Sequence, residues 1–243
     1  CAQCNNCSFV CPHAAIRPYA LDADEAANAP ESTKFTAKMI GKGCEGYKFT
    51  IAVSPLDCMG CTLCVKACPV NATAEKKAAA AGEKVKPEDL AIYMVPQAQE
   101  SAQQASFDYC VANVSSKELP FADNTVKGSQ FKQPLLEFSG SCAGCAETSY
   151  ARLITQLFGE RMYISNATGC SSIWGGSAPA TPYTVNKESG RGPAWANSLF
   201  EDNAEHGLGM ALGQKTIREK LIAKVADMAA SDKASADFKA AAE

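Results

Sequence analysis

Apolar and polar residues alternate in two neighbouring stretches near the start of the chain. The apolar positions of these stretches are Phe35, Ala37, Met39, Tyr47, Phe49, Ile51 and Val53. A period of two predicts a pair of β-strands, and Gly41-Lys42-Gly43 supplies turn residues between them. We therefore expect a hairpin inserted in residues 12–57.

The rest of the chain shows linker-like segments and then mixed elements. Residues 72–89 are rich in Ala, Lys and Glu, and residues 97–106 in Gln, Ala and Ser, so both are expected to be exposed helical or linking stretches. From about Gln133 the pattern predicts alternating strands and helices. The expected elements are a strand over 135–138, a helix over 150–158 capped by Gly159, a strand over 162–166, an amphipathic helix over 214–230 and a solvated C-terminal helix.

Composition limits the classes of protein that fit these elements. The 243 residues include 47% hydrophobic and 20% charged residues, which is typical of a globular protein. A net charge of -3 argues against general binding of nucleic acid. The chain has no apolar run long enough for a membrane helix and no signal segment. It begins on Cys1 and not on Met, so we expect a piece of a longer protein.

Thirteen cysteines are the unusual feature of the composition. Eight of them form two runs with the same C-x2-C-x2-C-x3-C-P spacing, namely Cys1, Cys4, Cys7 and Cys11 before Pro12, and Cys58, Cys61, Cys64 and Cys68 before Pro69. This is the spacing of bacterial ferredoxins with two [4Fe-4S] clusters, in which the fourth cysteine of each run ligates the other cluster. Zinc sites also use C-x2-C pairs, but zinc does not account for the third and fourth cysteines followed by proline.

The ferredoxin pattern assigns the eight thiolates to two crossed sets. One cluster is expected on Cys1, Cys4, Cys7 and Cys68, and the other on Cys58, Cys61, Cys64 and Cys11. Thiolates are the soft ligands that iron–sulfur clusters require.

Three further cysteines lie in small-residue loops that follow expected strands. Cys142 and Cys145 form a C-x2-C pair before the helix that contains Glu147 and Thr148, and Cys170 follows the strand over 162–166. If the two strands are neighbours, their end loops converge, and these cysteines supply three of the four ligands of a third cluster. Spacing alone leaves zinc or a C-x-x-C redox pair as alternatives.

Several other residues could carry chemistry but have simpler interpretations. We expect Cys44 and Cys110 to be buried free thiols. We expect His13 to cap local backbone, whereas His206 is a candidate proton carrier because it lies in a motif near the expected site. Trp174 and Trp195 are expected to serve in packing.

Four long segments resemble pyruvate:ferredoxin (flavodoxin) oxidoreductases. The matching stretches are Cys4 to Pro18, Ser139 to Thr148, Asn166 to Gly176 with Thr181-Pro182-Tyr183, and Gly190 to Gly207. The resemblance implies an enzyme that uses thiamine diphosphate, Mg2+ and coenzyme A to convert pyruvate to acetyl-CoA and CO2. It also implies that three [4Fe-4S] clusters pass the electrons to ferredoxin or flavodoxin.

The resemblance also assigns roles to residues around the third cysteine group. It implies that Cys142, Cys145 and Cys170 hold the proximal cluster, and that Glu147 and Cys170 lie against the thiamine diphosphate. The chain departs from the family at Ala146, where Gly is usual, and at Ser149, where Pro is usual. The family's fourth proximal ligand and its Gly-Asp-Gly magnesium segment belong further towards the C-terminus than this sequence extends.

Together these features predict two domains. Residues 1–115 are expected to form an α+β two-[4Fe-4S] ferredoxin-like domain with the inserted hairpin, and residues 116–243 the incomplete start of an α/β thiamine diphosphate-binding domain. The resemblance implies a homodimeric, cytoplasmic enzyme of which this chain is a part that is inactive alone, and whose partners include its remaining domains but no nucleic acid or membrane. The alternatives are an oxidoreductase for another 2-oxoacid and a stand-alone ferredoxin-type electron carrier.

Overall fold

The computed structural model describes residues 1–36, 38–177 and 180–242. The chain forms two compact units. Unit 1 comprises Cys1–Met162 and Ile173–Pro193, and unit 2 comprises Tyr163–Ser172 and Ala194–Glu243. These units do not coincide with the expected division at residues 115 and 116, which stays a prediction about domains of the parent enzyme.

Unit 1 contains an antiparallel sheet of three strands in the order β1-β3-β2. Its strands are β1 (Ile16–Leu21), β2 (Phe35–Thr36) and β3 (Lys48–Val53). β1 pairs with β3 from Ile16↔Val53 to Leu21↔Lys48, and β2 pairs with β3 at Phe35↔Thr50. The small sheets and the helices around them make the fold α+β.

The helices of unit 1 are mostly short. In the first half of the unit they are α1 (Asn6–Phe9), α2 (Ala23–Ala27), α3 (Leu63–Lys66), α4 (Pro69–Ala80), η1 (Pro87–Asp89), η2 (Gln97–Gln99) and α5 (Gln103–Asn113). The remaining ones are α6 (Val126–Ser129), α7 (Ala146–Phe158), η3 (Gly159–Arg161) and the π-helical η4 (Ile173–Ser177).

The predicted strand over 47–53 corresponds closely to β3, whereas the one over 35–39 is only partly matched. β2 covers two residues, Met39 lies outside any strand, and Ala37 lies outside the described residues. Met39 nevertheless contributes to the core, because it packs with Cys44 and Phe49.

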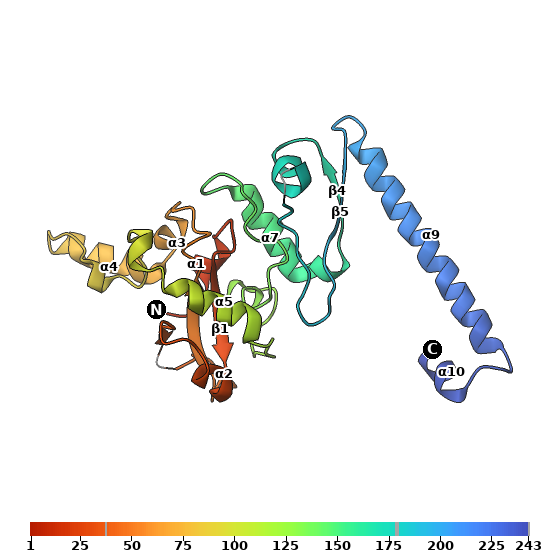
Figure 1. Cartoon of the computed structure of the whole chain (residues 1–243), viewed down its shortest axis with the longest axis horizontal. Helices are drawn as coiled ribbons and strands as arrows, with labels where there is room; N and C mark the ends of the chain where they lie inside the picture. The colour runs from red at the N-terminus through yellow and green to blue at the C-terminus, as the bar shows by residue number, and fades with distance from the viewer. Residues whose placement is uncertain (37, 178–179, 243) are drawn as a thin grey trace. The chain divides into compact units, whose positions relative to one another are not determined.

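The expectation of an exposed helical or linking stretch over 97–106 is wrong at Gln103 and Ser106, which are buried. α5 begins at Gln103 and packs on β3 (Figure 1). Phe107 and Cys110 are buried against Leu21 and Ala52 in the core. The apolar residues that bury one face of α5 follow directly after residues 97–106. The polar composition of that stretch therefore gave no sign of the buried face.

The expected strand over 135–138 is also wrong. Leu135 and Leu136 are buried, but the segment forms only an isolated antiparallel bridge between Leu136 and Tyr183. Phe138 has a φ of 52°, which takes the backbone out of the extended conformation. A short apolar run therefore fills the core here without joining a sheet.

α7 confirms the helix expected over 150–158, but the structure buries its polar side. Thr148, Arg152, Thr155 and Gln156 are buried, whereas Tyr150 and Phe158 are exposed. Gly159 ends the helix as expected, with a right-handed backbone. A side chain there would meet Leu135, because an ideal Cβ lies 2.8 Å from its Cδ1.

Unit 2 contains two parallel strands, β4 (Tyr163–Ala167) and β5 (Ala194–Ser198), paired from Tyr163↔Ala194 to Ala167↔Ser198. The short α8 (Cys170–Ser172) follows β4, and α9 (Asn203–Ala230) packs on β4. α10 (Ala236–Ala242) completes the unit. β4 confirms the strand expected over 162–166, but its partner is β5 and not residues 135–138. α9 includes the helix expected over 214–230, and none of its residues is buried.

Candidate functional site: three cysteine loops

The two cysteine runs fold into loops with the same backbone conformation. The second residue after the first cysteine has a positive φ in both, 53° at Gln3 and 66° at Gly60. The residue after the second cysteine repeats this, with 63° at Asn5 and 65° at Thr62. Left-handed residues in such a loop can turn nearby backbone N–H groups towards one point, which suits a negative group.

A short helix then follows in each loop, and the two helices contact each other. α1 begins after Asn5 and α3 begins after Thr62, and both carry the third cysteine of their run. The eight cysteines therefore lie on two equivalent loops within unit 1.

Cys7 and Cys64, the third cysteines of the two runs, have neighbours from both runs. Burial raises the pKa of Cys7 to about 12, and nearby Cys64, Cys4 and Cys68 contribute. Burial raises the pKa of Cys64 to about 11, with contributions from Cys11, Cys58 and Cys61. The fourth cysteine of each run is thus near the third cysteine of the other.

These sulfurs are not arranged for a single metal ion. All thirteen cysteines are free of disulfides. Within 1–36, 38–177 and 180–242, no three His, Cys, Asp or Glu side chains are grouped to hold one ion. Soft donors in two sets of four fit the ligand requirement of [4Fe-4S] clusters.

The third cysteine loop stabilises a thiolate at the start of α7. Cys145 is the N-cap residue of this helix. Burial works against ionisation, but hydrogen bonds from the backbone and hydroxyl of Thr148, the backbone of Glu147 and the hydroxyl of Ser141 lower the pKa of Cys145. N–H groups at a helix N-terminus favour a thiolate in this way, and a thiolate is the form that binds metal.

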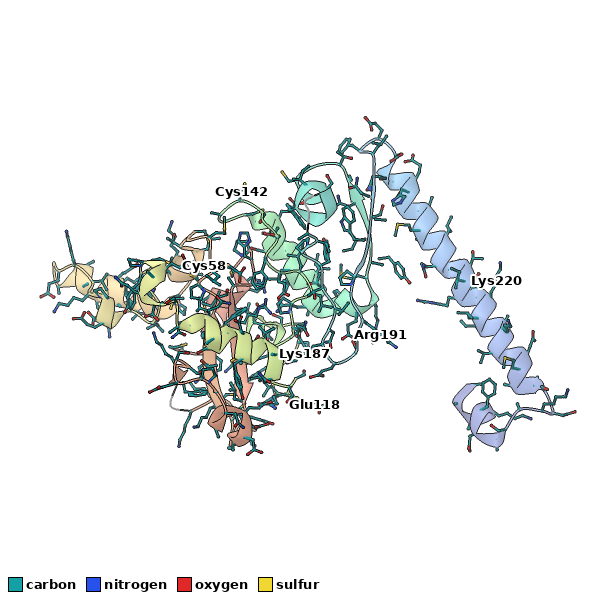
Figure 2. The ribbon with its side chains drawn as sticks, in the orientation of Figure 1. Cys58, Glu118, Cys142, Lys187, Arg191 and Lys220 are labelled. Carbon is teal, nitrogen blue, oxygen red and sulfur yellow. The ribbon has the colours of Figure 1, made fainter. Side chains whose placement is uncertain are left out.

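This loop lies beside the second cysteine run. An ideal Cβ on Gly144 would be 3.6 Å from the Cβ of Cys61. The loop also contacts the end of the first run, because the His13 ring hydrogen-bonds the Cys142 backbone and the His13 carbonyl accepts from Phe138 N–H. Figure 2 labels Cys58 of the second run and Cys142 of this loop.

Glu147 and Cys170 lie at the starts of two different helices. Glu147 is exposed in the first turn of α7. It lies close enough to Tyr183 to help raise the pKa of that phenol to about 12, although burial is the larger cause. Cys170 is exposed at the start of α8 in unit 2.

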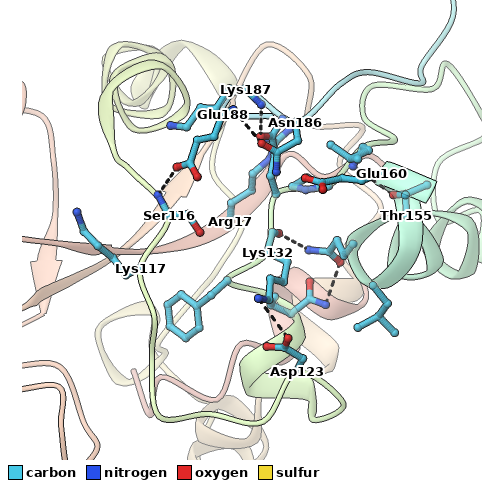
Figure 3. Close-up of a pocket in the computed structure, with 18 of the residues that line it drawn as sticks. Arg17, Ser116, Lys117, Asp123, Lys132, Thr155, Glu160, Asn186, Lys187 and Glu188 are labelled. Carbon is cyan, nitrogen blue, oxygen red and sulfur yellow. Dashed lines mark hydrogen bonds and ion pairs between the residues drawn. The ribbon is translucent and has the colours of Figure 1, made fainter. Parts of the chain in front are cut away.

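One cavity of unit 1 is a different kind of site. It has a volume of about 680 Å3, and none of its lining residues is a cysteine. Figure 3 shows its charged and polar lining, including Lys117, Lys132 and Lys187. These lysines are already engaged: Lys117 pairs with Asp22 and Glu25, Lys132 pairs with Asp123, and Lys187 donates to backbone carbonyls.

The structure also places the residues that had simpler interpretations. Cys44 and Cys110 are buried, as expected. His13 is buried, and burial lowers its pKa while its bond to the Cys142 backbone opposes the shift. In unit 2, Nδ1 of His206 hydrogen-bonds the Ser165 hydroxyl at 2.7 Å and so joins α9 to β4.

Sequence reasoning missed Arg152. This side chain is 1% exposed and reaches from α7 to the first cysteine loop, where it donates to the Phe9 carbonyl at 2.6 Å. The spacing of Thr148, Arg152 and Thr155 along one helix face is the signal that could have identified a buried polar side.

The fold and the paired loops define a class: unit 1 contains a dicluster iron–sulfur module. The family model for the 4Fe-4S dicluster domain matches residues 1–72, which include both complete cysteine runs. The expectation of a ferredoxin-like module is therefore confirmed.

The whole chain is homologous to a segment of one group of larger proteins. It is 53% identical over 244 residues to pyruvate:ferredoxin oxidoreductase of Moorella thermoacetica, an alignment that covers 100% of the chain and 19% of the relative. It is 52% identical to pyruvate-flavodoxin oxidoreductase of Klebsiella pneumoniae (91% and 17% covered) and 51% identical to pyruvate dehydrogenase [NADP(+)] of Cryptosporidium parvum (90% and 10%). The resemblance noted in the sequence is confirmed, and the chain spans less than one fifth of these relatives' length.

Among the described residues, no helix combines the length and apolar character needed to cross a membrane.

Proposed function

We propose that this chain is the electron-relay segment of a pyruvate:ferredoxin oxidoreductase. The carrying observation is the grouping of thiols from both runs around Cys7 and Cys64, in a chain that matches such enzymes over its whole length. In the parent enzyme, pyruvate and coenzyme A give acetyl-CoA and CO2, and the electrons leave to ferredoxin or flavodoxin.

Two [4Fe-4S] clusters bind in unit 1 with crossed ligands. Cys1, Cys4, Cys7 and Cys68 hold one, and Cys58, Cys61, Cys64 and Cys11 hold the other. When bound, such clusters carry electrons one at a time. The chain's own contribution is to fix the thiolates, turn backbone N–H groups towards them and partly cover Cys7 and Cys64, which are half-buried. The ligand thiols lose protons on binding, so loading is coupled to pH.

A third [4Fe-4S] cluster uses Cys142, Cys145 and Cys170, with its fourth cysteine outside this chain. The proposal is supported by the hydrogen bonds that favour the Cys145 thiolate and by the exposed thiols of Cys142 and Cys170. The contact of Gly144 with Cys61 gives this group a short route to the relay pair.

The parent enzyme binds thiamine diphosphate with Mg2+ next to the third cluster. Bound there, thiamine diphosphate supplies the carbanion chemistry that cleaves a 2-oxoacid. Glu147 serves as the carboxylate against this cofactor, which its exposed position at the start of α7 allows. Residues 116–243 are accordingly the first part of the thiamine diphosphate-binding domain, and the β2–β3 pair belongs to a hairpin inserted in the ferredoxin-like domain. We place the enzyme in the cytoplasm as a homodimer.

A chimeric enzyme tests this function. The matching segment of the Moorella thermoacetica enzyme is replaced by this chain, and pyruvate-dependent reduction of ferredoxin is measured anaerobically. We expect electron transfer in the chimera and its loss when Cys58→Ala is introduced, because that variant removes one relay cluster. A chimera with a full complement of clusters that does not reduce ferredoxin would exclude the function. Zinc in place of iron in the third site would exclude the third cluster.

A further inference from the structure

Arg152 is a buried cation without a carboxylate partner among the described ion pairs. Both of its terminal nitrogens are used: Nη1 donates to Gln130 Oε1 and Gln156 Oε1 at 2.8 Å, and Nη2 donates to the Phe9 carbonyl. Its Nε has no hydrogen-bond partner. Arg17, the other buried arginine of the unit, is paired with Glu137. A buried charge without a counter-charge is costly, so the environment of Arg152 calls for a negative group.

The segment that Arg152 holds connects the two cysteine sets. Phe9 lies between Cys7, in one set, and Cys11, in the other. The Ser8 hydroxyl donates to Gln130 Oε1, which also accepts from Arg152, and the Ser149 hydroxyl of α7 contacts the Val10 carbonyl at 3.4 Å. One face of α7 therefore fixes residues 8–10, immediately before the ligand that crosses over.

Two ionisable groups influence Arg152, namely Cys11 at the end of the first cysteine run and Arg17 on β1. Burial lowers the pKa of Arg152 to about 10, while Cys11 opposes the shift and Arg17 adds to it. Arg152 thus stays protonated near neutral pH, and Cys11 is the acidic group near it. Gln130 and Gln156 bring no charge.

We propose that Arg152 is a positioning residue for the cluster on Cys11, Cys58, Cys61 and Cys64, whose reduction potential it raises by placing a buried positive charge beside Cys11. This inference rests on the crossed ligation proposed above. Reduction adds a negative charge to a cluster, and a nearby cation in a medium of low dielectric constant stabilises the reduced form. The protein keeps the cation in place through the hydrogen bonds to Gln130, Gln156 and the Phe9 carbonyl.

The test is a potentiometric titration of the reconstituted chain, followed by electron paramagnetic resonance. The Cys61→Ala and Cys4→Ala variants first assign the two signals. Arg152→Gln removes the charge and should lower the ratio of reduced to oxidised Cys61-dependent cluster, at fixed potential, by roughly tenfold, equivalent to 59 mV for one electron. The Cys4-dependent cluster should shift less. Arg152→Lys keeps the charge and should retain the original potential.

The outcomes separate this inference from the proposed function. A wild-type chain that does not load two clusters refutes the crossed ligation itself. A loaded Arg152→Gln chain with unchanged potentials, or with equal shifts in both clusters, overturns the role of Arg152. If Arg152→Gln does not fold, Arg152→Lys decides: a retained potential supports the charge effect, and a tenfold loss contradicts it.

Discussion

Gly144 lies against Cys61, with an ideal Cβ on the glycine 3.6 Å from the Cβ of the cysteine. The contact brings the loop between Cys142 and Cys145 next to the second cysteine run, although the two are far apart in sequence. A redox group on that loop would therefore have Cys61 and its cysteine run as neighbours in unit 1.

Substitution of Gly144 should disturb this neighbour selectively. Gly144 has a φ of 76°, so Gly144→Val should cost about 1–2 kcal/mol of stability from backbone strain and also press its methyl groups on Cys61. Gly140→Val is the matched control, because Gly140 has a φ of 67° and open space around its Cβ position. We expect similar losses of melting temperature in both variants, but a changed resonance signal of the Cys61-dependent cluster only in Gly144→Val. Identical signals in the two variants would show that the contact is unimportant.

The hydrogen bonds to Cys145 should be visible in the reactivity of the cluster-free chain. Because these bonds lower the pKa of Cys145 below the ordinary 9.0, its alkylation by iodoacetamide should reach half its maximal rate below pH 9. Thr148→Val removes the hydroxyl but keeps the backbone N–H, so it should move this midpoint upward. Mass spectrometry of the peptide that contains Cys145 measures the rate at each pH. If Thr148→Val left the midpoint unchanged, the Thr148 hydroxyl would not contribute to the lowered pKa of Cys145.

The ion pair between Lys117 and Glu25 should stabilise unit 1 in a pH-dependent way. The atoms are 2.8 Å apart, and the side chains are 11% and 13% exposed. Lys117→Met should lower the free energy of unfolding by about 2 kcal/mol at pH 7. Burial alone would raise the pKa of Glu25, but bonds from Lys117 and Ser115 lower it overall from 4.5. The stabilisation is therefore fully present above that value and is lost as the pH falls through the lower folded-state pKa.

The matched control is Lys34→Met, which removes an exposed pair with Glu100. Exposed pairs contribute about 0–1 kcal/mol, so this variant should have a small effect at any pH. Denaturant unfolding at pH 7 and below pH 4 distinguishes the two. Equal effects of the two substitutions at pH 7 would contradict the assigned role of the Lys117 pair.

The parts of the structure that were predictable from sequence are those fixed by local pattern. The cysteine spacing identified the dicluster module, and alternation or helical spacing identified β3, β4 and α7 to within a few residues. The prediction of a strand at residues 135–138 was wrong. A short apolar run is found both in a strand and in a buried segment with an isolated bridge, so the sequence pattern does not distinguish them. The partner of Arg152 was not predictable, because the Phe9 carbonyl lies 143 positions away in the sequence.

The proximity of the Cys142 and Cys170 loops was predicted from a strand over 135–138, which does not form. The proposal of a third cluster is therefore supported by the hydrogen bonds to Cys145 and by the family resemblance. The position of α5 also depends on packing against residues that are distant in the sequence. Its polar start resembles a linker, and only the core formed by Leu21 and Ala52 shows why Phe107 and Cys110 point inward.

The central claim is the crossed ligation of two clusters, and the most direct measurement is the identity of the signal lost in Cys11→Ala. Anaerobic reconstitution of the wild-type chain should give about eight irons in the two relay clusters, and Cys44→Ala should leave them in place. We predict that Cys11→Ala loses the same resonance signal as Cys61→Ala and retains the one lost in Cys4→Ala. Loss of the Cys4-dependent signal instead, or a relay content near four irons in the wild type, would contradict the account.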